Sequence, residues 1–151
     1  MSGTSEKLPR REFLLASGAV ALGAAQVARA SDDEHVHHVA KYSALAHEAQ
    51  HCVMSGNACL SHCIADLRSG SLDLVDCLSR VEELVAVCQA MATVAALESE
   101  HVRALAAVTK DVCVTCEAEC RKFADKHDEC ADCADACLAC IKECDNVLKS
   151  A

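Results

Sequence analysis

The chain has 151 residues, a length that a single domain accounts for. Its formal net charge is −9, without a cluster of Lys and Arg or an aromatic stacking platform, so the composition excludes a nucleic-acid partner. Apolar residues make up 52% of the chain and aromatic residues only 2%, so Ala, Leu, Val and Cys must fill the core. From Ser71 onward there is neither Gly nor Pro, which predicts an all-α fold.

The first thirty residues are typical of an export signal. Arg10 and Arg11 precede an apolar run over 14–27, and residues 28–30 form an A-x-A cleavage site. This segment resembles a twin-arginine (Tat) signal. The apolar run of about 14 residues is short of the roughly 20 that span a membrane, which argues against an uncleaved anchor. We therefore predict that 1–30 is a cleaved Tat signal peptide and that the protein is exported to the periplasm or another extracytoplasmic compartment.

The rest of the chain, 31–151, is predicted to form one four-helix domain. Short polar joints separate helices expected at about 33–68, 72–97, 100–124 and 129–148. Gly70 is predicted to end the first helix, and Ser71 and Ser99 to cap the second and third. Joints this short make sequence neighbours antiparallel, so we predict an up-down-up-down four-helix bundle.

Thirteen cysteines recur along these helices at helical spacing. The five in the last helix are separated by steps of 3 and 4 residues, which return a side chain to one face. In each predicted hairpin, facing cysteines also lie at equal distances from the joint between the two helices. Cys63 matches Cys77 in this way, and Cys52 matches Cys88. We therefore predict a cysteine-lined core with a column of thiols roughly 20 Å long. The predicted metal ligands are Cys52, Cys59, Cys63, Cys77, Cys88, Cys113, Cys116, Cys120, Cys130, Cys133, Cys137, Cys140 and Cys144.

Several interpretations of a thiol-filled core have to be weighed. Buried Cys can act as a small hydrophobe, but thirteen in register are too many for that interpretation. Structural disulfides suit an exported protein, but thirteen is an odd number, and thiols three or four residues apart on one helix meet disulfide geometry poorly. The remaining alternatives are a thiol redox protein, a zinc-binding protein and an iron–sulfur protein.

Charge favours a monovalent soft metal over zinc. A Zn²⁺ held by four thiolates carries −2, and few Lys or Arg lie on the thiol seams to compensate several such sites. Cu(I) is soft and suits two or three thiolates, and equal numbers of Cu(I) and thiolate are neutral. The prediction is therefore on the order of 13 Cu(I) ions per chain, one for each thiolate. No catalytic pattern is evident, so we predict that the protein is not an enzyme.

The cysteine string resembles that of the bacterial copper storage proteins, specifically an exported branch described in methane-oxidising bacteria. The motifs that carry this resemblance are Cys59-Leu60-Ser61-His62-Cys63, the Cys-x-x-Cys-x-x-x-Cys run over 113–120 and the longer run over 130–144. The resemblance implies a homotetramer that stores copper and later supplies it to copper enzymes such as methane monooxygenase. It also implies Cys-x-x-x-Cys ligand pairs at 59/63, 116/120, 133/137 and 140/144.

Histidines and methionines complete the set of candidates. The resemblance implies that His62 assists copper entry, with a solvated surface His as the alternative, and His127 is a second candidate nearby. His35, His37 and His38 could capture copper, more readily Cu²⁺, or belong to a solvated terminus. We interpret His47 and His51 as a chance i,i+4 pair away from the thiol seam and expect no metal role for His101. Met54 and Met91 are predicted to pack against the core.

Overall fold

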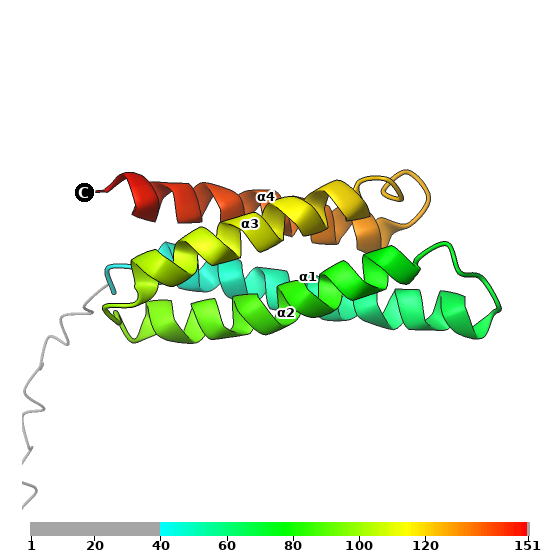
Figure 1. The fold of residues 1–151 in the computed structure, drawn as a ribbon, viewed down its shortest axis with the longest axis horizontal. Helices are drawn as coiled ribbons and strands as arrows, with labels where there is room; N and C mark the ends of the chain where they lie inside the picture. The colour runs from blue at the N-terminus through cyan, green and yellow to red at the C-terminus, as the bar shows by residue number, and fades with distance from the viewer. Residues whose placement is uncertain (1–39, 151) are drawn as a thin grey trace, which may run out of the picture. The chain divides into compact units, whose positions relative to one another are not determined.

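A computed structural model of the chain describes residues 40–150. These residues form four α-helices: α1 (Ser43–Arg68), α2 (Val75–Ala96), α3 (Val102–Cys120) and α4 (Asp128–Lys149). Figure 1 shows the helices side by side, joined by three tight turns, so that each helix runs opposite to the one before it. This arrangement confirms the predicted antiparallel four-helix bundle.

Each helix packs against two others, so the bundle is square in cross-section. α1 contacts α2 and α4, and α3 contacts the same two helices, whereas the diagonal pairs do not pack together. The α1–α2 turn (69–74) and the α3–α4 turn (121–127) lie at one end, which we call the turn end. The opposite end holds the α2–α3 turn (97–101), the start of α1 and the end of α4.

Several predicted helix ends were wrong. Residues 33–39 lie outside the described residues, but Ala40 to Tyr42 are not helical and α1 begins only at Ser43. α2 begins at Val75 rather than near residue 72, because its N-cap is Leu74 and not Ser71. The Ser71 hydroxyl instead accepts a hydrogen bond of 3.3 Å from the Asp73 N–H, which makes a local turn that competes with helix.

The third helix is shorter at both ends than expected. α3 begins at Val102, after a turn in which the Ser99 hydroxyl accepts a 3.2 Å hydrogen bond from the His101 N–H. It ends at Cys120, and residues 121–126 form consecutive turns instead of the predicted continuation to 124. α4 begins one residue before and ends one residue after its predicted limits.

Gly70 ends α1 as predicted. It has a φ of 94°, in the left-handed region, directly after the C-cap residue Ser69. The Gly70 N–H bonds to the Leu67 carbonyl and the Ser71 N–H to the Asp66 carbonyl, which are the two bonds of a Schellman motif. The chain can therefore reverse within six residues and bring α2 back along α1.

Gly56 has a different role, in the close packing of α1 against α2. It is buried, and a Cβ atom placed on it would lie 2.7 Å from Val85 Cγ2. A side chain at this position would push the two helices apart. The bundle therefore depends on a glycine in mid-helix, where its low helix propensity is otherwise unfavourable.

The core of the bundle consists of thiols toward the turn end and of aliphatic side chains toward the opposite end. Leu45, Met91, Ala95, Val102 and Ala106 are fully or almost fully buried, with exposures of 0–1%. They close the core at the opposite end. Within residues 40–150, no helix is both long enough and apolar enough to cross a membrane.

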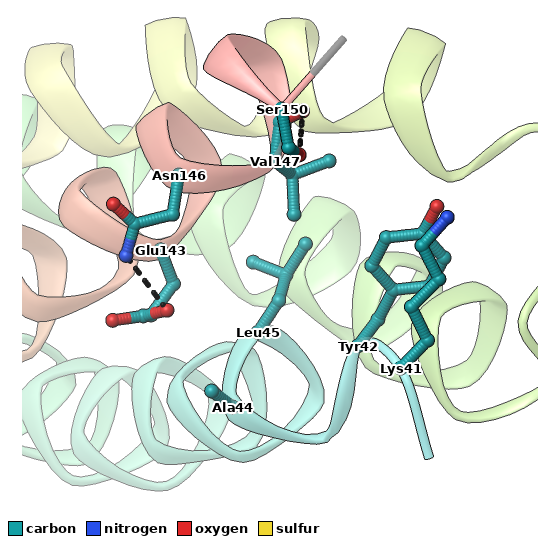
Figure 2. Close-up of a pocket in the computed structure, with 8 residues that line it drawn as sticks. All are labelled: Lys41, Tyr42, Ala44, Leu45, Glu143, Asn146, Val147 and Ser150. Atoms are coloured by element: carbon teal, nitrogen blue, oxygen red, sulfur yellow. Dashed lines mark hydrogen bonds between the residues drawn. The ribbon is translucent and has the colours of Figure 1, made fainter.

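A surface pocket lies at this opposite end, between the start of α1 and the end of α4. Lys41, Tyr42, Leu45 and Val147 contribute to its lining, together with polar groups of α4 (Figure 2). No cysteine lines it. The described structure thus associates this pocket with the aliphatic end of the bundle and not with the thiols.

Candidate metal centre

All thirteen cysteines lie in the helices, point inward and are free thiols. Each has a solvent exposure of 0%. α1 contributes three, α2 two, α3 three and α4 five, in the order of the sequence. The predicted thiol column is therefore confirmed, and all of its members are shielded from solvent by the bundle itself.

Sulfur atoms from different helices approach one another closely. Cys59 Sγ lies 3.9 Å from both Cys77 Sγ and Cys130 Sγ, and Cys77 Sγ lies 3.6 Å from Cys120 Sγ. Farther along the core, Cys88 Sγ lies 3.9 Å from Cys113 Sγ. Two metal–sulfur bonds of about 2.3 Å, the length found in zinc thiolates, span up to about 4.6 Å. One soft metal ion can therefore bridge thiols at these separations.

Eleven of the thirteen thiols form four groups, and within each group the sulfur atoms lie within 4.8 Å of one another. Two groups share Cys59 and two share Cys133, so three of the four are linked into one chain of contacts. The groups are Cys59, Cys63 and Cys77; Cys59, Cys120 and Cys133; Cys116, Cys133 and Cys137; and Cys52, Cys88, Cys113 and Cys140. Shared members mean that metal ions bound there would share thiolates rather than occupy separate sites.

One group has four members, and we call it the quartet: Cys52, Cys88, Cys113 and Cys140. It differs from the other groups because each of the four helices provides one of its thiols. Cys52 also donates an S–H···O bond of 3.2 Å to the Ala136 carbonyl of α4. A four-thiolate arrangement is the geometry that zinc prefers, so this is the place where the zinc alternative fits best. Within the described residues, however, Thr109 is the only fully buried polar or charged side chain, so no buried cation compensates a −2 centre.

The close contacts and the burial shift the pKa values of the thiols in both directions. The contact with Cys113 lowers the pKa of Cys52 to about 6, and contacts with Cys113 and Cys144 lower that of Cys140 to about 5. Burial, in contrast, raises the pKa of the Cys63 thiol to about 12. Contacts with Cys140, together with burial, also raise the pKa of Cys144. A soft metal ion that binds here displaces the protons that remain, because the thiolate is the form that binds metal.

The turn end of the column carries a pair of histidines. His62 Nε2 on α1 lies 3.0 Å from Nδ1 of His127, the N-cap residue of α4, and the ring centroids are 4.6 Å apart. His62 Nδ1 lies 3.6 Å from Glu129 Oε2, and the His62 side chain is 24% exposed. Cys63 directly follows His62, and Cys130 lies three residues after His127, so both histidines are close in sequence to the layer of thiols nearest the turn end. The pair thus stands between solvent and the thiol column.

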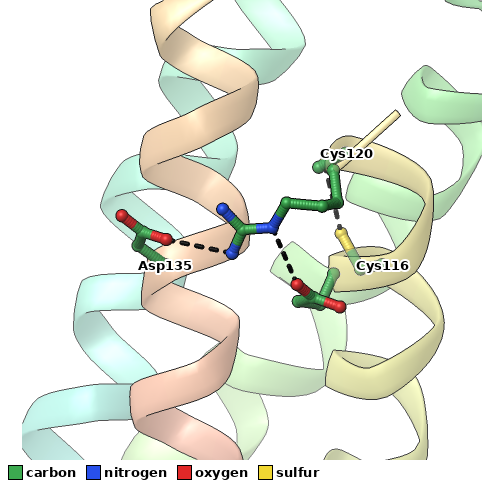
Figure 3. A network of polar contacts seen from close by, with 5 residues as sticks. Cys116, Cys120 and Asp135 are labelled. Carbon is green, nitrogen blue, oxygen red and sulfur yellow. Dashed lines mark hydrogen bonds and ion pairs between the residues drawn. The ribbon is translucent and has the colours of Figure 1, made fainter. Parts of the chain in front are cut away.

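A network of polar contacts fastens α3 to α4 beside this layer (Figure 3). Arg121 Nε donates a 2.9 Å hydrogen bond to Glu117, and its Nη2 donates a 3.0 Å hydrogen bond to Asp135 on α4. Cys116 and Cys120, whose sulfur atoms are 3.9 Å apart, lie on the same turns of α3. Their position relative to α4 is therefore supported from the surface as well as from the core.

The remaining sequence predictions had mixed outcomes. Met91 is fully buried as predicted, but Met54 is 63% exposed, and its predicted packing role was wrong. Met54 lies two residues beyond Cys52, which places it about 200° around α1 on the outer face. His101 is at the opposite end as expected. The cluster His35, His37 and His38 lies outside the described residues.

Sequence reasoning did not predict the contact between His62 and His127. It placed both residues near the same end, but the direct 3.0 Å approach depends on the path of the α3–α4 turn. The separation of 65 positions in sequence carries no periodic signal that would have identified it. The relevant clue was that facing cysteines lie equally far from the joint between their helices. This places residues 62 and 127 at the same position along the bundle axis.

A buried column of linked, free thiols inside a helical bundle defines a protein that holds several soft metal ions. Comparison with known proteins gives the family. A family model described as copper storage protein matches residues 37–149, and the chain belongs to that family. As a member of it, the protein stores copper on its core cysteines and is not an enzyme. This decides for storage over the thiol redox, zinc and iron–sulfur alternatives.

Individual relatives agree with this placement. The Cu(I)-bound copper storage protein BsCsp3 superposes with a TM-score of 0.64 and 26% identity, over 72% of this chain and 99% of that one. A cytosolic copper storage protein from Streptomyces lividans with five coppers superposes with a TM-score of 0.67 and 26% identity, over 73% of this chain and 93% of that one. The uncharacterized cysteine-rich protein YhjQ of Bacillus subtilis (strain 168) is 28% identical over 93 residues, or 62% of this chain and 82% of that protein.

Proposed function

We propose that the protein stores on the order of thirteen Cu(I) ions per chain, with all thirteen core cysteines as ligands. The observation that carries this proposal is the sharing of Cys59 and Cys133 between thiol groups, because bridging thiolates allow about one ion for each sulfur. Equal numbers of Cu(I) and thiolate leave the core neutral, as the lack of buried cations in residues 40–150 requires.

Native mass spectrometry of the reduced protein tests this capacity. After anaerobic addition of excess Cu(I), the main species should carry about ten or more copper ions and have lost about one proton for each ion. The same experiment with Zn²⁺ should give about one ion, at the quartet. A species with more zinc than copper would contradict the proposal.

Copper enters, on our proposal, at the turn end by way of His62, with His127 as its partner. Support comes from the 3.0 Å contact between the two rings and from the 24% exposure of His62, against 0% for every cysteine. Imidazole nitrogen is a good ligand for copper but a weaker one for Cu(I) than thiolate, so an ion captured there would move on into the column. The aliphatic side chains at the opposite end favour a single entrance.

The export of the protein is a further part of the proposal. Arg10 and Arg11, the apolar run that follows and the A-x-A motif support a Tat signal in 1–30, with 31–151 as the mature domain. The match to the family model begins at residue 37, after this segment. Fractionation of cells that express the full chain tests it. The mature form should reach the extracytoplasmic compartment, and R10K/R11K should retain the protein inside.

We also propose a homotetramer that later delivers copper to copper enzymes such as methane monooxygenase. The resemblance to the exported branch motivates this, and exposed apolar side chains on α3 and α4, including Val108 and Leu138, offer surface for association. Light scattering on the purified protein tests the oligomeric state. A mass four times that of the chain is expected, and a monomer at micromolar concentration would contradict it.

A further inference from the structure

The outer face of α1 carries a second group of side chains of the types that bind soft metal ions. His47, His51 and Met54 lie within about 60° of arc at 100° per residue, so they share one face of the helix. The side chains of His47 and His51 are 78% and 48% exposed, and Met54 is 63% exposed. Together with Gln50 they line a shallow surface pocket. None of these residues takes part in the thiol column.

Glu48 is within hydrogen-bond distance of one imidazole ring and lies close to the other. Its Oε1 lies 3.0 Å from His47 Nδ1 and its Oε2 lies 3.7 Å from His51 Nδ1, so one carboxylate faces the same nitrogen of both rings. A carboxylate that accepts the Nδ1 proton fixes the tautomer and leaves Nε2 as the metal-binding atom. Metal-binding histidines usually have a carboxylate at the other ring nitrogen, and Glu48 holds this position at His47.

Met54 supplies the third donor. Its exposed side chain lines the same surface pocket as the two imidazoles. Its thioether is a soft ligand, which favours Cu(I), whereas imidazole accepts either oxidation state of copper. Two imidazoles and one thioether thus make a neutral donor set that suits a single copper ion.

We propose that His47, His51 and Met54 form a surface site for one Cu(I) ion, with Glu48 as a positioning residue. The site lies on the same turns of α1 as Cys52, but on the opposite face from the buried thiols. Because its ligands are neutral and exposed, it holds copper more weakly than the thiolates and exchanges it with solution. It is therefore an additional, exchangeable site outside the storage core.

Methionine-methyl NMR tests the proposal on the full chain. The sequence has three methionines, so ¹³C-methyl labelling gives three resonances, of which Met54→Leu identifies one. The histidines at 35, 37 and 38 are changed to Ala throughout, so that they do not compete for copper. Cu(I) is added anaerobically in steps to beyond saturation of the thiols, and the three signals are followed.

The Met54 resonance should move only after the thiols are full, and it should saturate with about one further equivalent. The buried Met91 resonance should respond during filling of the core and not afterwards, which makes it the internal control. H47A/H51A should abolish the late Met54 shift, and Glu48→Gln should weaken binding by about tenfold. His101→Ala, which removes another exposed histidine, should change nothing.

A Met54 signal that never moves would overturn the surface site while leaving core storage intact. So would a late shift that survives H47A/H51A, because copper would then be bound elsewhere. A Met54 shift at the first equivalent, with Met91 unmoved, would support the surface site but contradict storage in the core. The two proposals therefore fail in different ways.

Discussion

Cys59 Sγ lies 3.9 Å from Cys130 Sγ, although 71 positions separate the two residues in sequence. Cys59 also lies 3.9 Å from Cys77 and shares a group with Cys120 and Cys133. It is therefore the residue through which thiols of all four helices are connected near the turn end. Its loss would therefore affect two groups at once.

Replacement of this connecting thiol should have a larger effect than replacement of a terminal one. We expect Cys59→Ala to lower capacity by about one or two Cu(I) and to weaken the layer at the turn end, because two groups lose a member. Cys144→Ala, which removes a thiol outside the four groups, should lower capacity by about one. Copper counted per chain after gel filtration measures both variants.

Both variants should remain folded without copper, since removal of one buried sulfur costs about 1 kcal/mol. Thermal unfolding of the copper-free variants is the control for this expectation. Complete loss of copper uptake from either single change would contradict storage distributed over the column.

His62→Ala should slow copper loading without reducing capacity. The His62 ring contacts His127 but lies outside the thiol groups, so its loss removes a capture step and leaves the thiolates in place. We expect a decrease of about tenfold in loading rate, within the range for loss of a supporting group at a metal site. Stopped-flow transfer from a chromogenic Cu(I) complex measures the rate.

His101→Ala is the matched control, because His101 is exposed and lies at the opposite end of the bundle. Its loading rate should equal that of the unchanged protein. An equal decrease in the two variants would place the entrance elsewhere.

The copper-free protein should lose stability in alkali. Burial raises the pKa of Cys63 from about 9 to about 12, so the unfolded chain releases this proton at lower pH than the folded one. The stabilisation is complete below about pH 9 and is lost as the pH rises from 9 to 12. The raised pKa of Cys144 acts in the same direction.

Urea unfolding of reduced, copper-free protein at several pH values measures this loss. The free energy of unfolding of the copper-loaded protein should depend much less on pH over the same range, because its thiols have already lost their protons. A copper-free protein whose stability rises between pH 9 and 12 would contradict the raised pKa values of Cys63 and Cys144.

Gly56→Ala should destabilise the bundle by about 1–3 kcal/mol, although Ala is the better helix former by about 1 kcal/mol. The new methyl group would meet Val85 Cγ2 at 2.7 Å, so α1 and α2 must move apart. Urea unfolding of the copper-free protein measures the change. The double variant G56A/V85A should regain part of the loss, and equal stabilities of the single and double variants would show that the contact is not the cause.

The sequence was sufficient to predict the bundle and its thiol column, for a physical reason. Side chains three or four residues apart lie on the same face of an α-helix. Because the thirteen cysteines follow this spacing, they identify the inward face of each helix. Facing pairs such as Cys63 with Cys77 then follow from the short turns, and the structure places these two in one group.

Features that depend on local hydrogen bonds or on the path of a turn were less predictable from the sequence. The Ser71 and Ser99 hydroxyls form turns with N–H groups two residues ahead, so the helices start later than the periodicity indicated. Met54 was assigned to packing from its residue type, but its angular position on α1 puts it outside. The contact between His62 and His127 depends on the shape of a turn that carries no periodic pattern.

An anaerobic Cu(I) titration of the reduced protein, with a chromogenic chelator in competition, tests the central claim most directly. Tight uptake of about ten or more Cu(I) per chain, with the free thiols disappearing in proportion, is the result that a shared thiol column predicts. Saturation at about one to three ions, with most thiols still titratable, would contradict storage along the column.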